Sequence, residues 1–332
     1  MKDLLNRLFE GYILPLQEAR DVMARMGKGE FSEAEIAAFL TVLRMRPVQG
    51  DELTGFREAL LNLCIPVNLS DYDTIDVVGT GGDGKNTFNI STLSCFIIAG
   101  AGYRVTKHGN YGLSSISGAS NMFEYFGYQF KNDPRELMNE LEETGICFFH
   151  APLFHPAMRF VGPVRKALKV RTLFNLMGPL INPGNPKNQL VGVADLPTME
   201  LYDQVFRKSK QNYVLVHSMD GYDEIALTAE TRYRTRNESG KWFPADFGFE
   251  QVKPEELRGG ASVAEAASIF RSILEGEGSN GQNQVVVANA AAGIRCLCPE
   301  KSLNECVEEA KESLASKRAL DVFRKLLNFK AS

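Results

Sequence analysis

The sequence predicts an α/β protein in which a small, all-helical N-terminal domain precedes a larger domain with a central, mainly parallel sheet flanked by helices. Residues 1–66 carry apolar side chains at helical spacing and show no strand pattern. From residue 74 onward, short β-branched runs alternate with helical segments, which is typical of a sheet with crossover helices. The 332 residues, 44% hydrophobic and 23% charged, are enough for about two globular domains.

The N-terminal region is predicted to form short helices. Apolar residues recur at helical spacing within residues 4–9, and Ser32 with Glu35 has the spacing of a capping box that opens a further helix. Pro47 ends that helix, and a fourth is expected over residues 51–64. Because short helices alone enclose a poor core, this region should pack on the rest of the chain or on a second copy of itself. We therefore expect a homodimer.

The larger domain is expected over residues 73–330, with a segment near residues 165–185 joining the helical domain. Strands are predicted at residues 75–78, 103–106, 146–149, 189–193 and 213–217. Helices are predicted at residues 91–102, after Pro156, after Pro197, and at residues 263–274 and 284–294. Residues 243–260 show no clear period and are predicted to be an irregular surface excursion.

Charge and cysteine content argue against several kinds of protein. A net charge of -4 disfavours a nucleic-acid coat, which needs a surplus of Lys and Arg on one face. The six cysteines are scattered and only Cys296 and Cys298 lie close together, so we expect reduced, structural thiols. The longest apolar run, residues 95–103, is far below the ~20 residues that a membrane span needs. We expect a cytoplasmic protein with no nucleic-acid or membrane partner.

A glycine-rich turn, Gly79 to Gly84, follows the first predicted strand, where ligands of open α/β sheets bind. Its glycines allow backbone N–H groups to approach a phosphate closely. The spacing also matches a dinucleotide fingerprint, but such folds begin the helix at once and end the next strand with an acidic residue. Here residues 85–91 intervene, and the next strand ends in Lys107-His108. The pattern favours another phosphate ligand, and a tight turn without a ligand is the alternative.

Two further places follow predicted strands. Residues 107–118 combine a cation with amide and hydroxyl donors and glycines, which suits an anion, although Gly and Ser are also typical of mobile surface loops. Asp223-Glu224 offers adjacent carboxylates of the kind that hold Mg²⁺ together with substrate phosphates. Adjacent acids are also common in solvated turns. The metal interpretation therefore depends on the two phosphate-type loops that accompany the pair.

Together, several segments form a joint signature. They are residues 79–83, 89–92 and 107–110, Ser114-Ser115, residues 154–156, Arg165, residues 174–183 and Asp223-Glu224. Along nearly the whole chain they resemble the anthranilate phosphoribosyltransferases, of the nucleoside-phosphorylase-like phosphoribosyltransferase class. The resemblance implies transfer of a phosphoribosyl group from phosphoribosyl pyrophosphate to the amine of anthranilate, with Mg²⁺, in tryptophan biosynthesis. It also implies dimerisation through the helical domain and an active site in the cleft between the domains.

The resemblance implies roles for individual residues. Phosphoribosyl pyrophosphate would be bound by Gly79, Gly82, Asp83, Thr87, Asn89, Ile90, Ser91, Thr92, Lys107, Gly109, Ser114, Ser115 and Ala119. Anthranilate would be bound by Gly79, Asn110, His155 and Arg165, and Mg²⁺ by Ser91, Asp223 and Glu224. The expected catalytic residues are His108, Arg165, Asp223 and Glu224. For the histidines the alternative is a bond to a backbone carbonyl, and for Arg165 a helix-surface charge.

The sequence departs from the family pattern in the second loop. Tyr111 replaces the usual arginine, and Ala119-Ser120-Asn121 replaces the usual Ser-Ala-Asp, so that a cation and a hydroxyl are missing or moved. We expect either that Ser120 supplies the hydroxyl from one position along or that the N–H of Ala119 suffices.

Three other functions stay open on sequence grounds. A pyrimidine-nucleoside phosphorylase shares the architecture, but Arg165 and residues 178–180 would then have no purpose. A non-catalytic relative that binds nucleic acid should have a basic surface and a lost acidic pair. A nicotinamide-dependent oxidoreductase would use the Gly79 to Gly84 turn for its cofactor.

Overall fold

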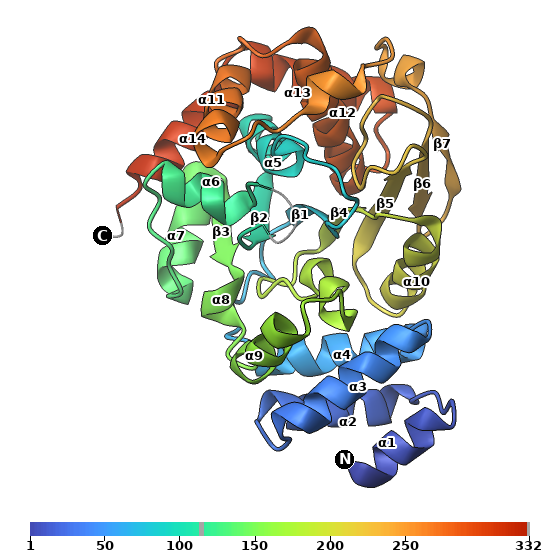
Figure 1. The fold of residues 1–332 in the computed structure, drawn as a ribbon. Coiled ribbons are helices and arrows are strands. Elements are labelled where there is room, and N and C mark those ends of the chain that lie inside the picture. Colours follow the sequence, from blue (N-terminus) through green and yellow to red (C-terminus); the bar gives the residue numbers. More distant parts are fainter. Residues whose placement is uncertain (113–115, 331–332) are drawn as a thin grey trace.

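The computed structural model describes residues 1–112 and 116–330. Figure 1 shows a group of N-terminal helices beside a larger part in which helices surround a sheet. The predicted fold class, a small helical domain followed by an α/β domain with a mainly parallel sheet, is confirmed.

The first four helices are close to those expected. They are α1 (Lys2–Phe9), α2 (Leu16–Gly27), α3 (Glu33–Met45) and α4 (Gly50–Leu63). Ser32 caps α3 as predicted: its hydroxyl accepts from the N–H of Glu35, and the Glu35 carboxylate accepts from the N–H of Ser32. The capping box therefore fixes the start of this helix.

The sheet has seven strands in the order β3-β2-β1-β4-β5-β6-β7. They are β1 (Thr74–Gly79), β2 (Arg104–Gly109), β3 (Ile146–His150), β4 (Asn188–Gly192), β5 (Asn212–Ser218), β6 (Thr231–Thr235) and β7 (Ser239–Trp242). The first five in this order pair in parallel, and β6 and β7 are antiparallel. The chain leaves β1 toward β2 on one side and later returns to β4 on the other. The boundary between β1 and β4 is therefore the topological switch point, where ligands bind in such sheets.

The remaining helices lie around this sheet, apart from the helix Met158–Leu168, which packs against α2 and α3. They are α5 (Ile90–Gly100), α6 (Ala119–Tyr125), α7 (Pro134–Thr144), α8 (Ala151–Phe154), α9 (Met158–Leu168), α10 (Leu196–Arg207), α11 (Val263–Leu274), α12 (Asn280–Leu297), α13 (Leu303–Ala315) and α14 (Arg318–Asn328). Short 3₁₀ helices are η1 (Leu173–Asn175), η2 (Gly178–Leu180), η3 (Pro244–Phe247) and η4 (Pro254–Leu257). Within the described residues, none of the helices has the length and apolarity to cross a bilayer.

Alternate residues of the central strands enter two different hydrophobic cores. Leu190 and Val216 belong to the core that contains α5 and α12, whereas Val191 and Leu215 belong to the core that contains α10. The second core also holds the buried side chains of α2, α3 and α4. The helical domain therefore packs on the rest of the chain, as expected. Arg57 adds polar contacts, donating to Leu180 O (3.1 Å) and Gln211 Oε1 (2.8 Å).

Two features of the C-terminal half differ from the sequence-based expectation. The hairpin of β6 and β7 was not predicted, and residues 243–260 are not a surface excursion throughout. They are irregular apart from η3 and η4, but Phe247, Val252 and Leu257 are buried in the core that contains α5 and α12. This segment is therefore anchored by apolar side chains that show no periodic pattern.

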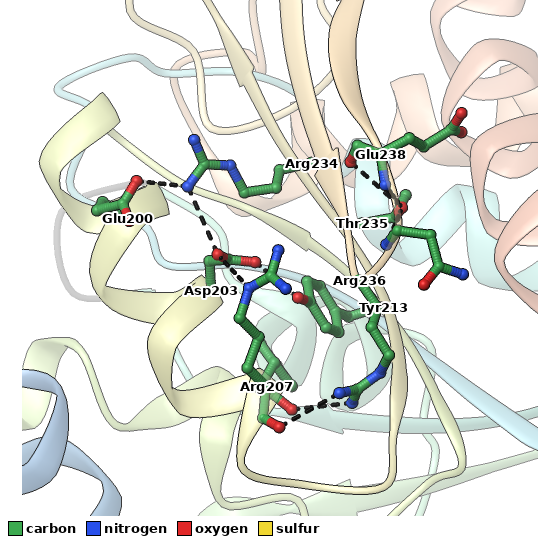
Figure 2. Close-up of polar contacts among 10 residues, drawn as sticks. Glu200, Asp203, Arg207, Tyr213, Arg234, Thr235, Arg236 and Glu238 are labelled. Carbon is green, nitrogen blue, oxygen red and sulfur yellow. Dashed lines mark hydrogen bonds and ion pairs between the residues drawn. The ribbon is translucent and has the colours of Figure 1, made fainter.

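The hairpin is fastened to the end of α10 by Arg236 (Figure 2). Its guanidinium donates to the carbonyl oxygens of Phe206, Arg207, Ser209 and Gln211, at 2.9 to 3.2 Å. These include carbonyls at the helix terminus that lack a partner within the helix. On the same helix, Asp203 accepts from Arg207, from Arg234 and from the hydroxyl of Tyr213. Polar contacts thus hold the antiparallel edge of the sheet against α10.

Candidate active site

The candidate site begins at the carboxyl end of β1, at the switch point. Gly81, Gly82 and Gly84 adopt φ of 68°, 78° and 74°, a region that side chains with a Cβ rarely enter. The N–H of Thr80 donates to Gly192 O at 2.9 Å, which ties the turn to β4. Helix α5 begins only at Ile90. The immediate strand-to-helix transition of a dinucleotide fold is therefore missing, as the sequence indicated.

The acidic pair lies directly against this turn and against the start of α5. The N–H of Gly81 donates to Asp223 Oδ2 at 2.6 Å, and the N–H of Ser91 donates to Glu224 Oε1 at 3.1 Å. The structure therefore brings Ser91, Asp223 and Glu224, the three predicted metal ligands, to one place.

Two glycines make room for the acidic pair. A Cβ at Gly79 would lie 2.4 Å from Asp223 Oδ2, and a Cβ at Gly192 would lie 1.6 Å from the carbonyl oxygen of Asp223. Gly192 was not identified from the sequence. The need for a glycine at this position follows from the contact between β4 and the segment after β5, which only the structure shows. An isolated glycine at the end of a predicted strand does not by itself indicate such a contact.

The carboxylates at this place resist ionisation in the metal-free protein. Burial, with a further contribution from the nearby Asp83, raises the pKa of Asp223 to about 7. Burial and the charges of Asp223 and Asp83 raise the pKa of Glu224 well above its usual value. A cation at this position would relieve the repulsion among the three carboxyl groups.

Lys107 and His108, at the end of β2, also reach the site. Lys107 Nζ is buried, donates to Val77 O at 2.5 Å and lies 3.4 Å from Ser91 Oγ. The N–H of His108 donates to Asp76 Oδ1 at 3.3 Å. Asp76 is fully buried, and burial raises its pKa to about 6, although Lys107 opposes that shift. The sequence offered one signal for Asp76: a carboxylate inside an otherwise β-branched strand.

The two predicted histidines form a buried pair. The ring centroids of His108 and His155 are 5.3 Å apart, and His108 Nδ1 lies 3.2 Å from Gly178 O. In the described part of the chain, His108 Nε2 has no hydrogen-bond partner. Burial lowers the pKa of His108 well below its usual value and that of His155 to about 4. Both rings are therefore neutral at pH 7.

The second loop is organised by Asn89 and Asn121. Asn89 Nδ2 donates to Ser117 O at 3.1 Å, and Asn121 Oδ1 accepts from the N–H groups of Gly112 and Gly118. Gly109 and Ala119 pack together, because a Cβ at Gly109 would lie 3.0 Å from Ala119 Cβ. Asn110 is exposed at the end of β2. The predicted residues Ser114 and Ser115 lie outside the described part of the chain.

Ser120 does not supply the missing hydroxyl of this loop. Its side chain is fully buried, and its Oγ lies 2.9 Å from His150 Nδ1. The expectation that Ser120 replaces the moved hydroxyl is therefore wrong, and the N–H of Ala119 is the remaining candidate. Tyr111, which stands where the family has an arginine, donates from its hydroxyl to Glu124 at 3.2 Å.

Four other predicted contacts have surroundings that differ from those of the acidic pair. Ile90 is fully buried in the core, its N–H donates to Phe88 O and its carbonyl accepts from Ser94, so no free group faces a substrate. This argues against the predicted role of Ile90. Thr92 is buried, and Thr87 forms a β-bridge to Arg258. Arg165 lies on α9, half-buried, with its Cζ 5.5 Å from the ring centre of Phe174.

The comparisons agree with this architecture. The helical bundle domain of the glycosyl transferase family matches residues 2–64, and the a/b domain of that family matches residues 71–320. Anthranilate phosphoribosyltransferase from Phocaeicola vulgatus is 50% identical over 98% of this chain and 99% of its own length. The chain belongs to the anthranilate phosphoribosyltransferase family. The resemblance inferred from the sequence motifs is thereby confirmed.

Other members of the anthranilate phosphoribosyltransferase family give the same result. The enzyme from Flavobacterium psychrophilum is 49% identical over 98% of both chains. The crystal structure of the enzyme from Thermus thermophilus has a TM-score of 0.92 and 32% identity, and it covers 97% of this chain and 98% of its own. The enzyme from Saccharomyces cerevisiae, in complex with PRPP and Mg, has a TM-score of 0.90 at 24% identity over 98% and 96% of the two chains. This last likeness shows the fold.

Proposed function

We propose that this protein transfers the phosphoribosyl group of phosphoribosyl pyrophosphate to the amine of anthranilate, giving phosphoribosyl-anthranilate and pyrophosphate, in tryptophan biosynthesis. The observation that carries the proposal is the contact of Asp223 with the glycine-rich turn and of Glu224 with the start of α5. It joins a phosphate-type turn, a helix N-terminus and a carboxylate pair at the switch point of a chain from this family.

The residues present fit Mg²⁺ as the metal. Among the described residues, no group of three or more His, Cys, Asp and Glu side chains forms a ready-made metal cage. Mg²⁺ does not require one, because it keeps several waters and uses one or two carboxylates together with substrate phosphates. Burial, with a further contribution from neighbouring carboxylates, raises the pKa values of Asp223 and Glu224, and a cation there would favour their ionised forms. Ser91, Asp223 and Glu224 are the proposed ligands.

The proposed donor site uses the turn, the start of α5 and Lys107. The charge of Lys107 and the N-terminus of α5 both favour a pyrophosphate group. Bound Mg²⁺ would neutralise the pyrophosphate as it leaves C1 of the ribose. The proposed donor contacts are Gly79, Gly82, Asp83, Thr87, Asn89, Ser91, Thr92, Lys107, Gly109 and Ala119.

The acceptor chemistry needs no strong base. The anthranilate amine already carries its lone pair, so the protein has mainly to orient it opposite the leaving group. Burial lowers the pKa of His108 and of His155, so both rings are neutral. Neutral aromatic rings suit the path along which the aromatic ring of anthranilate would reach that position. Asn110 and Arg165 remain the proposed anthranilate contacts.

Arg165→Ala is expected to raise the KM for anthranilate by about 10-fold or more, because a charge-assisted bond to the carboxylate is lost. The kcat and the KM for phosphoribosyl pyrophosphate should change much less. Steady-state kinetics with each substrate varied separately measures this. Lys166→Ala, which removes an exposed cation from the next position of α9, is the matched control. Equal effects of the two substitutions would contradict the assignment.

The reaction itself is tested by mixing the protein with anthranilate, phosphoribosyl pyrophosphate and Mg²⁺ and following anthranilate fluorescence. The expected result is a loss of fluorescence that requires all three components. No loss would refute the proposal, and turnover of thymidine with inorganic phosphate would instead favour a pyrimidine-nucleoside phosphorylase. A salt-dependent shift of single-stranded DNA in a gel would favour the nucleic-acid-binding alternative.

We also propose that the protein is a cytoplasmic homodimer that associates through the helical domain. Exposed apolar side chains in that domain support this: Phe9 is 63% exposed, Ile13 49% and Met45 83%. Light scattering should give twice the monomer mass of 36.8 kDa. Phe9→Glu with Met45→Glu should shift the protein toward the monomer. A dimer unaffected by these charges would place the interface elsewhere.

A further inference from the structure

Arg171 lies between α9 and η1 and contacts the glycine-rich turn, although no sequence motif drew attention to it. Its Nη1 donates to Gly82 O at 2.7 Å, and its Nη2 lies 3.4 Å from Gly81 O. A Cβ at Gly82 would come within 2.2 Å of the Arg171 guanidinium. The planar fork of Arg171 therefore rests on two successive peptide groups of the turn.

This contact sets the direction of the neighbouring backbone donors. In a trans peptide the N–H points away from the C=O. Because Arg171 holds the carbonyls of Gly81 and Gly82, the N–H groups of Gly82 and Asp83 point to the opposite side of the turn. Within the described residues, neither N–H has a hydrogen-bond acceptor. The residues that precede these two N–H groups, Gly81 and Gly82, both have positive φ, and successive backbone N–H groups in such a turn form a concave anion site.

We propose that Arg171 is a positioning residue that holds the turn so that the N–H groups of Gly82 and Asp83 face the pyrophosphate. The inference rests on the proposed function and assigns to this site a residue that does not itself touch the reacting atoms. Arg171 belongs to the segment that also carries Arg165, six positions earlier on the chain. It therefore ties the donor turn to the segment proposed to bind the acceptor.

The role depends on the fork of the side chain more than on its charge. The Lys ammonium is a compact point charge, whereas the Arg guanidinium presents parallel donors that reach two carbonyl oxygens together. Arg171 is exposed, so its loss should leave the fold intact. Arg171→Ala and Arg171→Lys are therefore both expected to loosen the turn, and thermal unfolding should hardly change.

The decisive measurement is calorimetric binding of magnesium pyrophosphate, with hydrogen exchange of the peptide covering residues 79–84. Arg171→Ala and Arg171→Lys should each weaken pyrophosphate binding by about 10-fold and speed exchange at the N–H groups of Thr80 and Gly81, which have acceptors in Gly192 and Asp223. The KM for phosphoribosyl pyrophosphate should rise in parallel while the KM for anthranilate stays within about twofold. The control is Lys169→Asn, which removes a nearby cation at φ 54°, a conformation that Asn tolerates.

Four results would contradict these proposals. Wild-type binding by Arg171→Lys would show that charge alone acts and would overturn the inference. Unchanged exchange of the turn in Arg171→Ala would overturn it as well, because the effect on binding would then be direct contact. Weaker binding by Lys169→Asn to the same extent would reduce the role to general electrostatics and also overturn it. Failure of the unmodified protein to bind magnesium pyrophosphate would instead overturn the proposed function.

Discussion

Replacing both carboxylates of the acidic pair, as Asp223→Asn with Glu224→Gln, is expected to lower magnesium-dependent turnover by roughly 100-fold or more. The substituted amides keep the shape of the side chains. In the unmodified protein Asp223 accepts from the N–H of Gly81 at 2.6 Å, and Glu224 accepts from the N–H of Ser91 at 3.1 Å. The amide oxygens of the substituted side chains can accept from the same N–H groups. The change therefore removes negative charge from the proposed metal site without removing the contacts that fix the turn.

The folded state should not suffer from this substitution. Burial raises the pKa values of both carboxyl groups, with repulsion by Asp83 on Asp223 and by Asp223 and Asp83 on Glu224, so their ionised forms destabilise the folded protein when no cation is bound. Without Mg²⁺ at pH 8, the melting temperature of the double variant should equal that of the unmodified protein or lie slightly above it. Asp220→Asn, which removes an exposed carboxylate three residues earlier, is the control and should leave kinetics unchanged. Wild-type turnover in the double variant would remove the metal assignment.

The part of the site that lies at the ends of parallel strands could be predicted from the sequence. Gly79 and Lys107 lie near the carboxyl ends of the neighbouring strands β1 and β2, and Asp223 follows β5, so the parallel direction of the strands brings all three to the same end of the sheet. Their mutual distances needed the structure. Gly192 and Arg171 show why: each matters only through a backbone atom of a segment far away in sequence.

Other misses have different physical causes. The hairpin strand β6 (Thr231–Thr235), which lies next to the edge strand β7, is rich in Thr and Arg, and most of its side chains are partly exposed. It therefore lacks the apolar pattern of the buried strands. Ser120 turns inward because His150 lies within hydrogen-bond distance on the neighbouring strand. Neither arrangement can be predicted from the spacing of residues in the sequence. Prediction from the sequence thus succeeded for the central parallel strands and failed at the edge and in side-chain orientation.

The affinity of the acidic pair for Mg²⁺ is expected to rise steeply between pH 6 and pH 8. In an unfolded chain an Asp side chain has a pKa of about 3.9, whereas burial raises the pKa of Asp223 to about 7. Folding thus strengthens proton binding, and the metal-free protein should lose stability as the pH rises from about 4 to about 7. Mg²⁺ binds the ionised carboxylate and must displace that proton at pH 6. One pH unit below the pKa, the apparent affinity should be about tenfold weaker than above it.

This dependence is measured by following thermal unfolding at increasing Mg²⁺ concentrations at pH 6, 7 and 8. A ligand that binds only the folded state raises the melting temperature, and the rise grows with the ratio of the free ligand concentration to Kd. The concentration of Mg²⁺ that gives half the maximal rise should fall as the pH increases. Asp223→Asn should weaken the response and flatten its pH dependence, because the carboxyl group whose pKa burial raises to about 7 is gone. An equal Mg²⁺ response at pH 6 and pH 8 in the unmodified protein would mean that the metal does not compete with this proton, and would place it away from Asp223.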